Sequence, residues 1–133
     1  MFCLQWVYFH SIKLNQVIVF RWKIITEQFW TYPHGFAAMK EIDSQLYTRL
    51  SQYTHLIFKG DLNYRKLVND INWPPNTAFK TALKGFLPCP LLALRTLKAD
   101  TIAGLETGVA ERVSSKSPDW LVSGEFGIIM HAS

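Results

Sequence analysis

The sequence predicts an α/β domain, a partial three-layer α/β/α arrangement with a largely parallel sheet. Two apolar runs of strand length, HLIF at 55–58 and LLALRT at 91–96, are separated by segments with helical spacing. Strands that alternate with helices are typical of this class. The 133 residues are 49% hydrophobic and 14% aromatic, which suffices for one buried core and excludes a disordered chain. We expect residues 26–133 to form this domain and residues 1–25 to be a divergent apolar segment.

Charge and cysteine content exclude several functions. Fourteen Lys and Arg against ten Asp and Glu give a net charge of +4, too small and too scattered for a nucleic-acid-binding surface. Cys3 and Cys89 show neither CxxC nor metal-ligand spacing. They are therefore expected to be free thiols of an intracellular, cytoplasmic protein. The sequence does not determine the oligomeric state.

The first 25 residues are apolar but do not resemble a membrane span. MFCLQWVYFH and QVIVFRWKII are broken by His10, Lys13, Arg21 and Lys23. Neither run reaches the ~18 uninterrupted apolar residues of a membrane helix. A signal peptide would begin with a basic segment and end in small residues, which this start lacks. We expect no membrane association.

From residue 26 onward, turn residues and periodicity divide the chain into elements. TYPHG reads as a turn, and Met39, Ile42, Leu46 and Leu50 give the segment 37–53 one apolar helical stripe, interrupted near Asp43. HLIF follows as a strand. Asp61 is then placed to be the N-cap of a short helix.

The second half is predicted in the same way. NWPPN is a loop, because consecutive prolines exclude a helix there. Asn76 or Thr77 is expected to cap the helix AFKTALKGF, which stops at Gly85. The remaining segments are LPCP as a loop, LLALRT and TIAGL as apolar runs of strand length, GVAERV as a helix, SSKSPDW as a loop and EFGIIMHA as a final strand.

FKGDLNYRKL, residues 58–67, places charged and hydrogen-bonding groups directly after a buried strand. Gly60 permits a sharp turn, and a helix start offers backbone N–H groups to an anion. Asp61 could accept a hydrogen bond from a sugar hydroxyl, from a capping N–H or from Lys98. Arg65 could bind two phosphate oxygens. The alternative is a polar turn whose Lys59, Arg65 and Lys66 are solvated surface charges.

LLALRTLKAD ends a second strand on cations. Strand alternation sends Thr96 and Lys98 to one face and Arg95 to the other, so that one residue could brace the site while the others contact a ligand. In sheets of this class, ligands bind beyond the carboxyl ends of the strands, where both polar stretches fall. The alternative is a pair of surface cations where the strand emerges.

Other candidate residues do not form recognisable motifs. His10, His34, His55 and His131 show no HxxxH or HExxH spacing, and GxSxG, GxGxxG and the P-loop are absent from the sequence. An aromatic cluster that could stack bases lacks interleaved basic residues, so we expect it to pack as core; it comprises Trp22, Phe29, Trp30, Tyr32 and Phe36.

FKGDLNYRKL, then LLALRTLKAD, then GVAERV and PDW occur in an order that resembles one family. The chain is similar to the C-terminal part of the metal-dependent damage-control phosphatases, in the RTxK-motif subfamily also called the acidic residue methyltransferase-like group. The resemblance runs from about Phe29 to the end of the chain.

The resemblance implies hydrolysis of sugar phosphates, fructose 1-phosphate and fructose 6-phosphate among them, with a divalent ion such as Mn, Co, Ni or Mg. S-adenosylmethionine-dependent carboxyl methylation is the alternative activity. The substrate-binding residues implied are Asp61, Leu62, Asn63, Tyr64 and Arg65, together with the RTxK residues Arg95, Thr96 and Lys98. Lys98 is implied to be the phosphate-binding, catalytic lysine.

The family's metal ligands have no counterpart in this sequence. The resemblance places an Asp-Asn pair and a further Asp upstream of Phe29, and the adjacent pair Asn69-Asp70 is reversed and follows a helix. The chain is thus interpreted as a truncated sugar-phosphate phosphatase, inactive alone. Two other hypotheses are a non-catalytic sugar-phosphate-binding module and an interaction protein with exposed aromatic surface.

Overall fold

The chain divides into two compact units, Met1–Pro33 and His34–Ser133. The structure, a computed structural model, describes residues 7–14 and 17–133. Cys3, predicted to be a free thiol, lies outside these residues. Cys89 is free and buried, and burial raises the pKa of its thiol. In the described ranges, no helix combines the length and the apolar character that crossing a bilayer requires.

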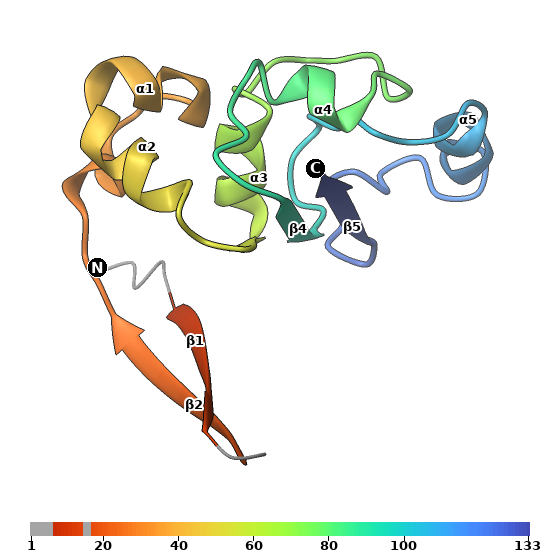
Figure 1. Cartoon of the computed structure of the whole chain (residues 1–133). Helices are drawn as coiled ribbons and strands as arrows, with labels where there is room; N and C mark the ends of the chain where they lie inside the picture. The colour runs from red at the N-terminus through yellow and green to blue at the C-terminus, as the bar shows by residue number, and fades with distance from the viewer. Residues whose placement is uncertain (1–6, 15–16) are drawn as a thin grey trace. The chain divides into compact units, whose positions relative to one another are not determined.

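The first unit is built on a β-hairpin (Figure 1). β1 (Val7–Leu14) and β2 (Val17–Ile24) pair antiparallel, with Val7 opposite Ile24 and Leu14 opposite Val17. Within the described residues, the apolar segments 7–14 and 17–24 therefore pair with each other, in a two-stranded sheet of their own. A 3₁₀ turn, η1 (Gln28–Thr31), follows the hairpin.

The second unit begins with an interrupted helix, as the sequence predicts. A 3₁₀ turn, η2 (Phe36–Ala38), leads into α1 (Met39–Ile42) and α2 (Ser44–Leu50). The break is at Asp43, which has φ −146° and ψ 74°, and whose carboxylate accepts a hydrogen bond of 2.9 Å from the Leu46 N–H. Asp43 thus caps α2 and ends α1.

Replacing this cap gives a first prediction. Asp43→Ala should lower the free energy of unfolding by about 1 kcal/mol, because an Asp cap satisfies an N–H that otherwise has no partner in the helix. Urea unfolding followed by circular dichroism measures the change. Asp43→Asn, which keeps a capping oxygen, is the control and should lose much less; equal losses in the two variants would contradict the capping role.

A three-stranded sheet forms the centre of the second unit, with the order β3-β4-β5. β3 (Leu56–Lys59) and β4 (Leu91–Thr96) are parallel, and β5 (Gly127–Ala132) pairs antiparallel to β4. These are the strands predicted from HLIF, LLALRT and EFGIIMHA. The predicted α/β class is confirmed.

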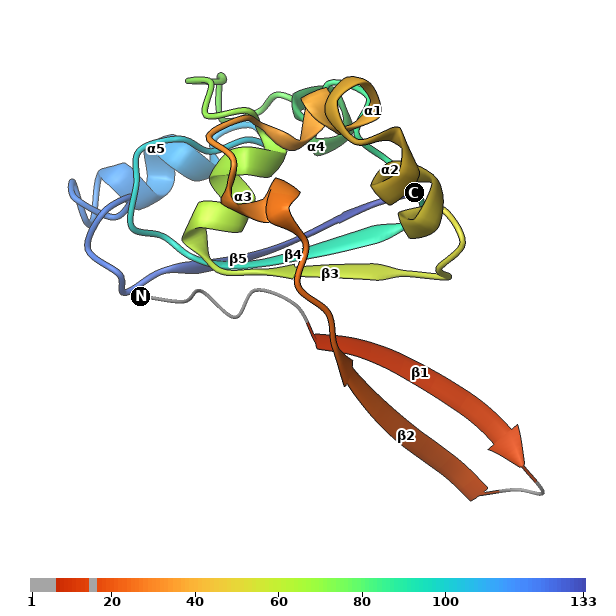
Figure 2. The same ribbon diagram turned by 90° about the vertical axis from the view of Figure 1, so that its left-hand side faces the viewer.

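Helices cover one face of this sheet (Figure 2). α3 (Asp61–Leu67) packs against β3 and β4, and α4 (Phe79–Ala82) packs against β5. Alternate strand residues such as Phe58 point into this helical layer and are buried, whereas Ile57 is 44% and Ile129 73% exposed on the other face. The period of two along each strand explains the alternation.

Aromatic rings dominate the core between the sheet and the helices. The ring centroids of Phe36, Phe58 and Phe86 lie 5.3–5.9 Å apart. A second cluster contains Leu97, Ile102 and Trp120, close to α5 (Val109–Ser114). This second cluster supports the chain immediately after β4.

The predictions for TIAGL and for the cap of α4 are wrong. TIAGL, residues 101–105, is not a strand: Gly104 has φ +88°, and its N–H donates to the Thr77 carbonyl at 2.7 Å. The segment is a largely buried loop whose hydrogen bonds go to residues 75 and 77 and to side chains and backbone of other segments, so its apolar content reflects burial and not a β-ladder. In addition, neither Asn76 nor Thr77 caps α4, because the helix starts one residue later with Ala78 at the cap position.

Candidate functional site

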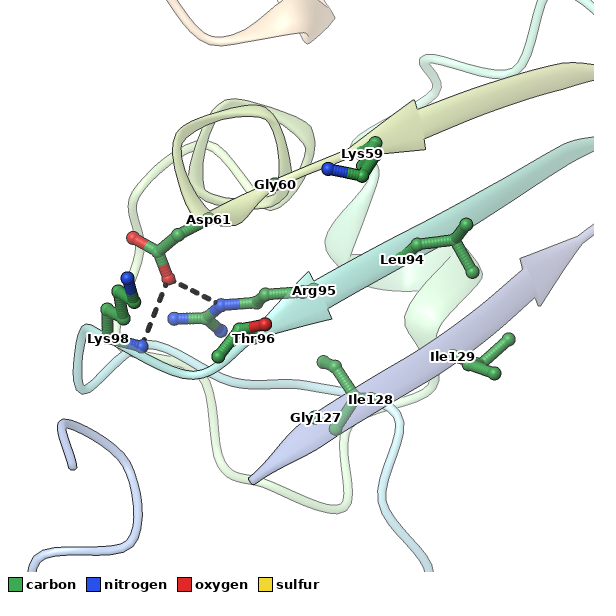
Figure 3. A pocket seen from close by; sticks show the side chains of 10 residues that line it. All are labelled: Lys59, Gly60, Asp61, Leu94, Arg95, Thr96, Lys98, Gly127, Ile128 and Ile129. Carbon is green, nitrogen blue, oxygen red and sulfur yellow. Dashed lines mark hydrogen bonds and ion pairs between the residues drawn. The ribbon is translucent and has the colours of Figure 1, made fainter. Parts of the chain in front are cut away.

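A pocket of about 570 Å³ lies at the carboxyl ends of β3 and β4, beside the start of β5 (Figure 3). Seven of its lining residues come from the two polar stretches singled out in the sequence: Lys59, Gly60, Asp61, Leu94, Arg95, Thr96 and Lys98.

The pairing of β3 with β4 explains why these residues meet. The strands are parallel neighbours with Lys59 opposite Leu94, so both polar ends emerge at one edge of the sheet. The chain turns at Gly60, which has φ +102° and donates its N–H to the Leu94 carbonyl at 2.8 Å. A β-carbon is strained at this φ, which explains the glycine. The predicted adjacency of the two stretches is confirmed.

Asp61 does not cap α3, contrary to the simplest interpretation of its position. The N-cap of α3 is Gly60, with no side-chain cap. The Asp61 carboxylate instead accepts a hydrogen bond of 2.7 Å from Arg95 Nε and a longer one of 3.4 Å from the backbone N–H of Lys98. A charged partner across the strands outcompetes a neutral N–H of its own helix.

Arg95 is buried, and its side chain has no exposed surface. Besides Asp61, its guanidinium donates to the carbonyl of Thr101 and, at 2.8 Å, to that of Ala99. Its Cζ lies 4.5 Å from the centre of the Tyr64 ring. Arg95 therefore braces the site from the helix side of the sheet, while the exposed Thr96 points to the other side, as the alternation predicts.

Tyr64 lies in the core beneath Arg95 and is 1% exposed. Its ring stacks on Phe79 at 6.0 Å between centroids, and its hydroxyl exchanges hydrogen bonds of 3.0 Å with the N–H and the carbonyl of Ala103. Burial raises its pKa, so the hydroxyl stays protonated at neutral pH. Tyr64 connects α3 to the loop after β4.

Lys59 and Lys98 are the exposed cations of the pocket. Within the described part of the chain, neither ammonium group has an ion pair or hydrogen bond, whereas the Asp61 charge is balanced by Arg95. The exposed Thr96 adds a hydroxyl. The arrangement leaves an excess of positive charge at the pocket and suits an anionic ligand.

Four residues predicted to bind substrate do not line the pocket: Leu62, Asn63, Tyr64 and Arg65. Leu62 is 49% exposed, and the Asn63 side chain is buried and donates to the Lys59 carbonyl at 2.8 Å. Arg65 forms a two-point ion pair with Asp70 at 2.7 and 2.8 Å, which lowers the pKa of that carboxyl group.

The sequence interpretation missed the contribution of β5. Gly127, Ile128 and Ile129 also line the pocket, because antiparallel pairing brings the start of β5 beside the end of β4, with Gly127 opposite Thr96. A β-carbon at Gly127 would lie 3.2 Å from the Arg95 carbonyl oxygen. A glycine at the start of a predicted strand was the available signal of close approach.

Comparison with known proteins decides the family. The model of the damage-control phosphatase ARMT1-like domain matches residues 9–113. This chain belongs to that family. The resemblance inferred from the two polar stretches is thereby confirmed. The match begins upstream of Phe29, inside the segment 1–25, and it ends before β5.

Relatives in this family are similar to most of the chain. The chain is 44% identical to damage-control phosphatase ARMT1 of Danio rerio over 112 residues, which are 84% of this chain and 25% of the relative. It is 48% identical to that of Xenopus tropicalis over 101 residues, 76% of this chain and 23% of the relative. For the Homo sapiens protein the values are 40% over 111 residues, 84% and 25%. The chain thus spans about a quarter of the length of these relatives.

Proposed function

We propose that this chain binds a sugar phosphate, of the fructose 1-phosphate or fructose 6-phosphate type, in the pocket beyond β3 and β4. The observation that carries this proposal is the pair of unneutralised ammonium groups, Lys59 and Lys98, beside an aspartate whose charge Arg95 balances. The two lysines bind the phosphoryl group. Asp61 accepts hydrogen bonds from sugar hydroxyls, and Thr96 supplies a further hydroxyl.

The remaining residues implied by the resemblance take different parts in this proposal. Arg95 and Tyr64 support the pocket and do not contact the ligand. Arg65 binds phosphate only if it exchanges its ion pair with Asp70 for a contact with the ligand. The side chains of Arg65 and Asp70 are 38% and 57% exposed, so the pair is accessible enough to open. Leu62 and Asn63 follow the turn at Gly60, in the first turn of α3.

The divalent ion implied by the resemblance does not fit the residues of this pocket. Among residues 7–14 and 17–133, no three His, Cys, Asp or Glu side chains are grouped closely enough to hold a metal ion. The one carboxylate that lines the pocket, Asp61, is paired with Arg95 and lies among lysines that would repel a cation. We therefore propose binding of the sugar phosphate without hydrolysis by this chain alone.

Lys98→Ala tests the binding proposal. The variant should bind fructose 1-phosphate about ten- to hundred-fold more weakly, because it loses a charge-assisted contact of ~1.5–3 kcal/mol. Isothermal titration calorimetry of the intact chain, with fructose as the uncharged comparison ligand, measures the change.

Lys116→Ala is the matched control, since Lys116 is an exposed lysine outside the pocket. Equal affinities of the Lys98→Ala and Lys116→Ala variants would contradict the proposal, as would equal affinity for fructose and its phosphate. Competition by S-adenosylmethionine at the same pocket would instead favour the methyltransferase alternative.

A further inference from the structure

The loop that follows β4 is held by a buried side chain. It carries Lys98, and its anchors are the carbonyls of Ala99 and Thr101, both bound by the Arg95 guanidinium. The same guanidinium holds Asp61, whose carboxylate accepts the Lys98 N–H. The Arg95 side chain thus contacts the first polar stretch at Asp61 and the 98–101 turn at two of its carbonyls. Asp61 in turn holds the N–H at the start of that turn.

A second contact layer lies beneath the guanidinium. Tyr64 packs its ring against Arg95, with 4.5 Å between the guanidinium carbon and the ring centre, and fixes Ala103 through two hydrogen bonds of its hydroxyl. Thr101 adds a hydrogen bond of 2.6 Å to the Ile71 carbonyl. The loop is therefore bound from α3, from β4 and from the chain that follows α3.

We propose that Arg95 is a positioning residue: its guanidinium, supported by Tyr64, holds the 98–101 turn against Asp61 and thereby presents the Lys98 ammonium to the phosphoryl group. The inference rests on the proposed sugar-phosphate site and assigns the buried arginine a role without ligand contact. The position of Lys59, which is the last residue of β3, does not depend on the contacts of Arg95.

The geometry requires a guanidinium and not merely a positive charge. Arg95 uses three separate nitrogens, Nε, Nη1 and Nη2, for three acceptors that lie in different directions. A planar fork can serve all three at once, whereas a lysine ammonium on a flexible stem serves them from a single atom. Arg95→Lys keeps the charge and releases part of the turn.

A double-mutant cycle tests this positioning role. In the native background Lys98→Ala weakens binding of fructose 1-phosphate about ten- to hundred-fold. In the Arg95→Lys background the same substitution should weaken it less than about threefold, because Lys98 is no longer held in place. Lys59→Ala is the control, and its effect should be the same in both backgrounds.

Two outcomes of the cycle overturn the inference. One is an undiminished Lys98→Ala effect in the Arg95→Lys background. The other is an equal reduction of the Lys59→Ala and Lys98→Ala effects, which indicates general loosening of the pocket. Tyr64→Phe, which keeps the ring and removes only the hydroxyl, should reduce the Lys98→Ala effect in the same direction by a smaller factor.

A ligand-free measurement separates this inference from the proposed function. Amide hydrogen exchange in residues 98–103 should accelerate by roughly tenfold in Arg95→Lys and in Tyr64→Phe, with exchange in β5 unchanged. If the native chain binds no sugar phosphate, the proposed function fails, and exchange alone then decides whether Arg95 orders the turn. Exchange that stays native in both variants, or that accelerates equally in β5, overturns the positioning role.

Discussion

Arg95→Met lowers the free energy of unfolding by about 3–5 kcal/mol, the expected loss when one partner of a buried ion pair is removed. The substitution leaves Asp61, whose side chain is 22% exposed, without its cation, and it leaves the carbonyls of Ala99 and Thr101 without their donor. Methionine has a similar length and fills the space above Tyr64, so the loss reflects the polar contacts. Chemical unfolding with urea measures it.

Arg65→Met is the matched control, because it breaks another arginine–aspartate pair at the surface. The side chains of Arg65 and Asp70 are 38% and 57% exposed. Exposed pairs contribute about 0–1 kcal/mol, since both ions are solvated when separated. Because Arg65 lowers the pKa of Asp70, that small contribution is present at neutral pH and is lost as the pH falls through the native-state pKa. If Arg95→Met and Arg65→Met lowered the free energy of unfolding by similar amounts at neutral pH, burial would not be the reason for the larger expected effect at Arg95.

The second large effect is the absence of turnover. The purified chain should release no inorganic phosphate from fructose 1-phosphate in the presence of Mn, Co, Ni or Mg ions. The physical reason is that Arg95 engages the pocket's carboxylate and that the exposed charged groups there are lysines, which repel the divalent ion needed to activate a water.

Release of inorganic phosphate over time is the measurement, with the Danio rerio relative in the same assay as the comparison. Ion-dependent release by this chain that a chelator abolishes and that Lys98→Ala diminishes would show that the pocket is catalytic. Release that the Lys98→Ala variant shows at the same rate would come from a contaminating phosphatase, so this variant distinguishes contamination from activity of the chain.

Local patterns were sufficient for most elements of the second unit. The apolar stripe of Met39, Leu46 and Leu50 predicted the helices, and Asp43 predicted their interruption, because capping and periodicity involve residues within one or two turns. HLIF and LLALRT predicted β3 and β4 for the same reason. Their parallel pairing followed from the α/β pattern and brought Asp61 and Lys98 to one pocket.

The sequence by itself thus determined the helices, the three strands, the family and the two stretches that carry the site. Only the tertiary structure decided which polar side chains face the pocket. Arg65 and Asp61 lie four residues apart on one helix, yet Arg65 pairs with Asp70 while Asp61 pairs with Arg95, and Lys59 and Gly127 join the site from different strands. Packing and desolvation determine which hydrogen-bonding groups distant in sequence become partners, and a local sequence pattern does not predict such pairs. TIAGL became a loop for the same reason, since its partners were the carbonyls of residues 75 and 77 and not a strand.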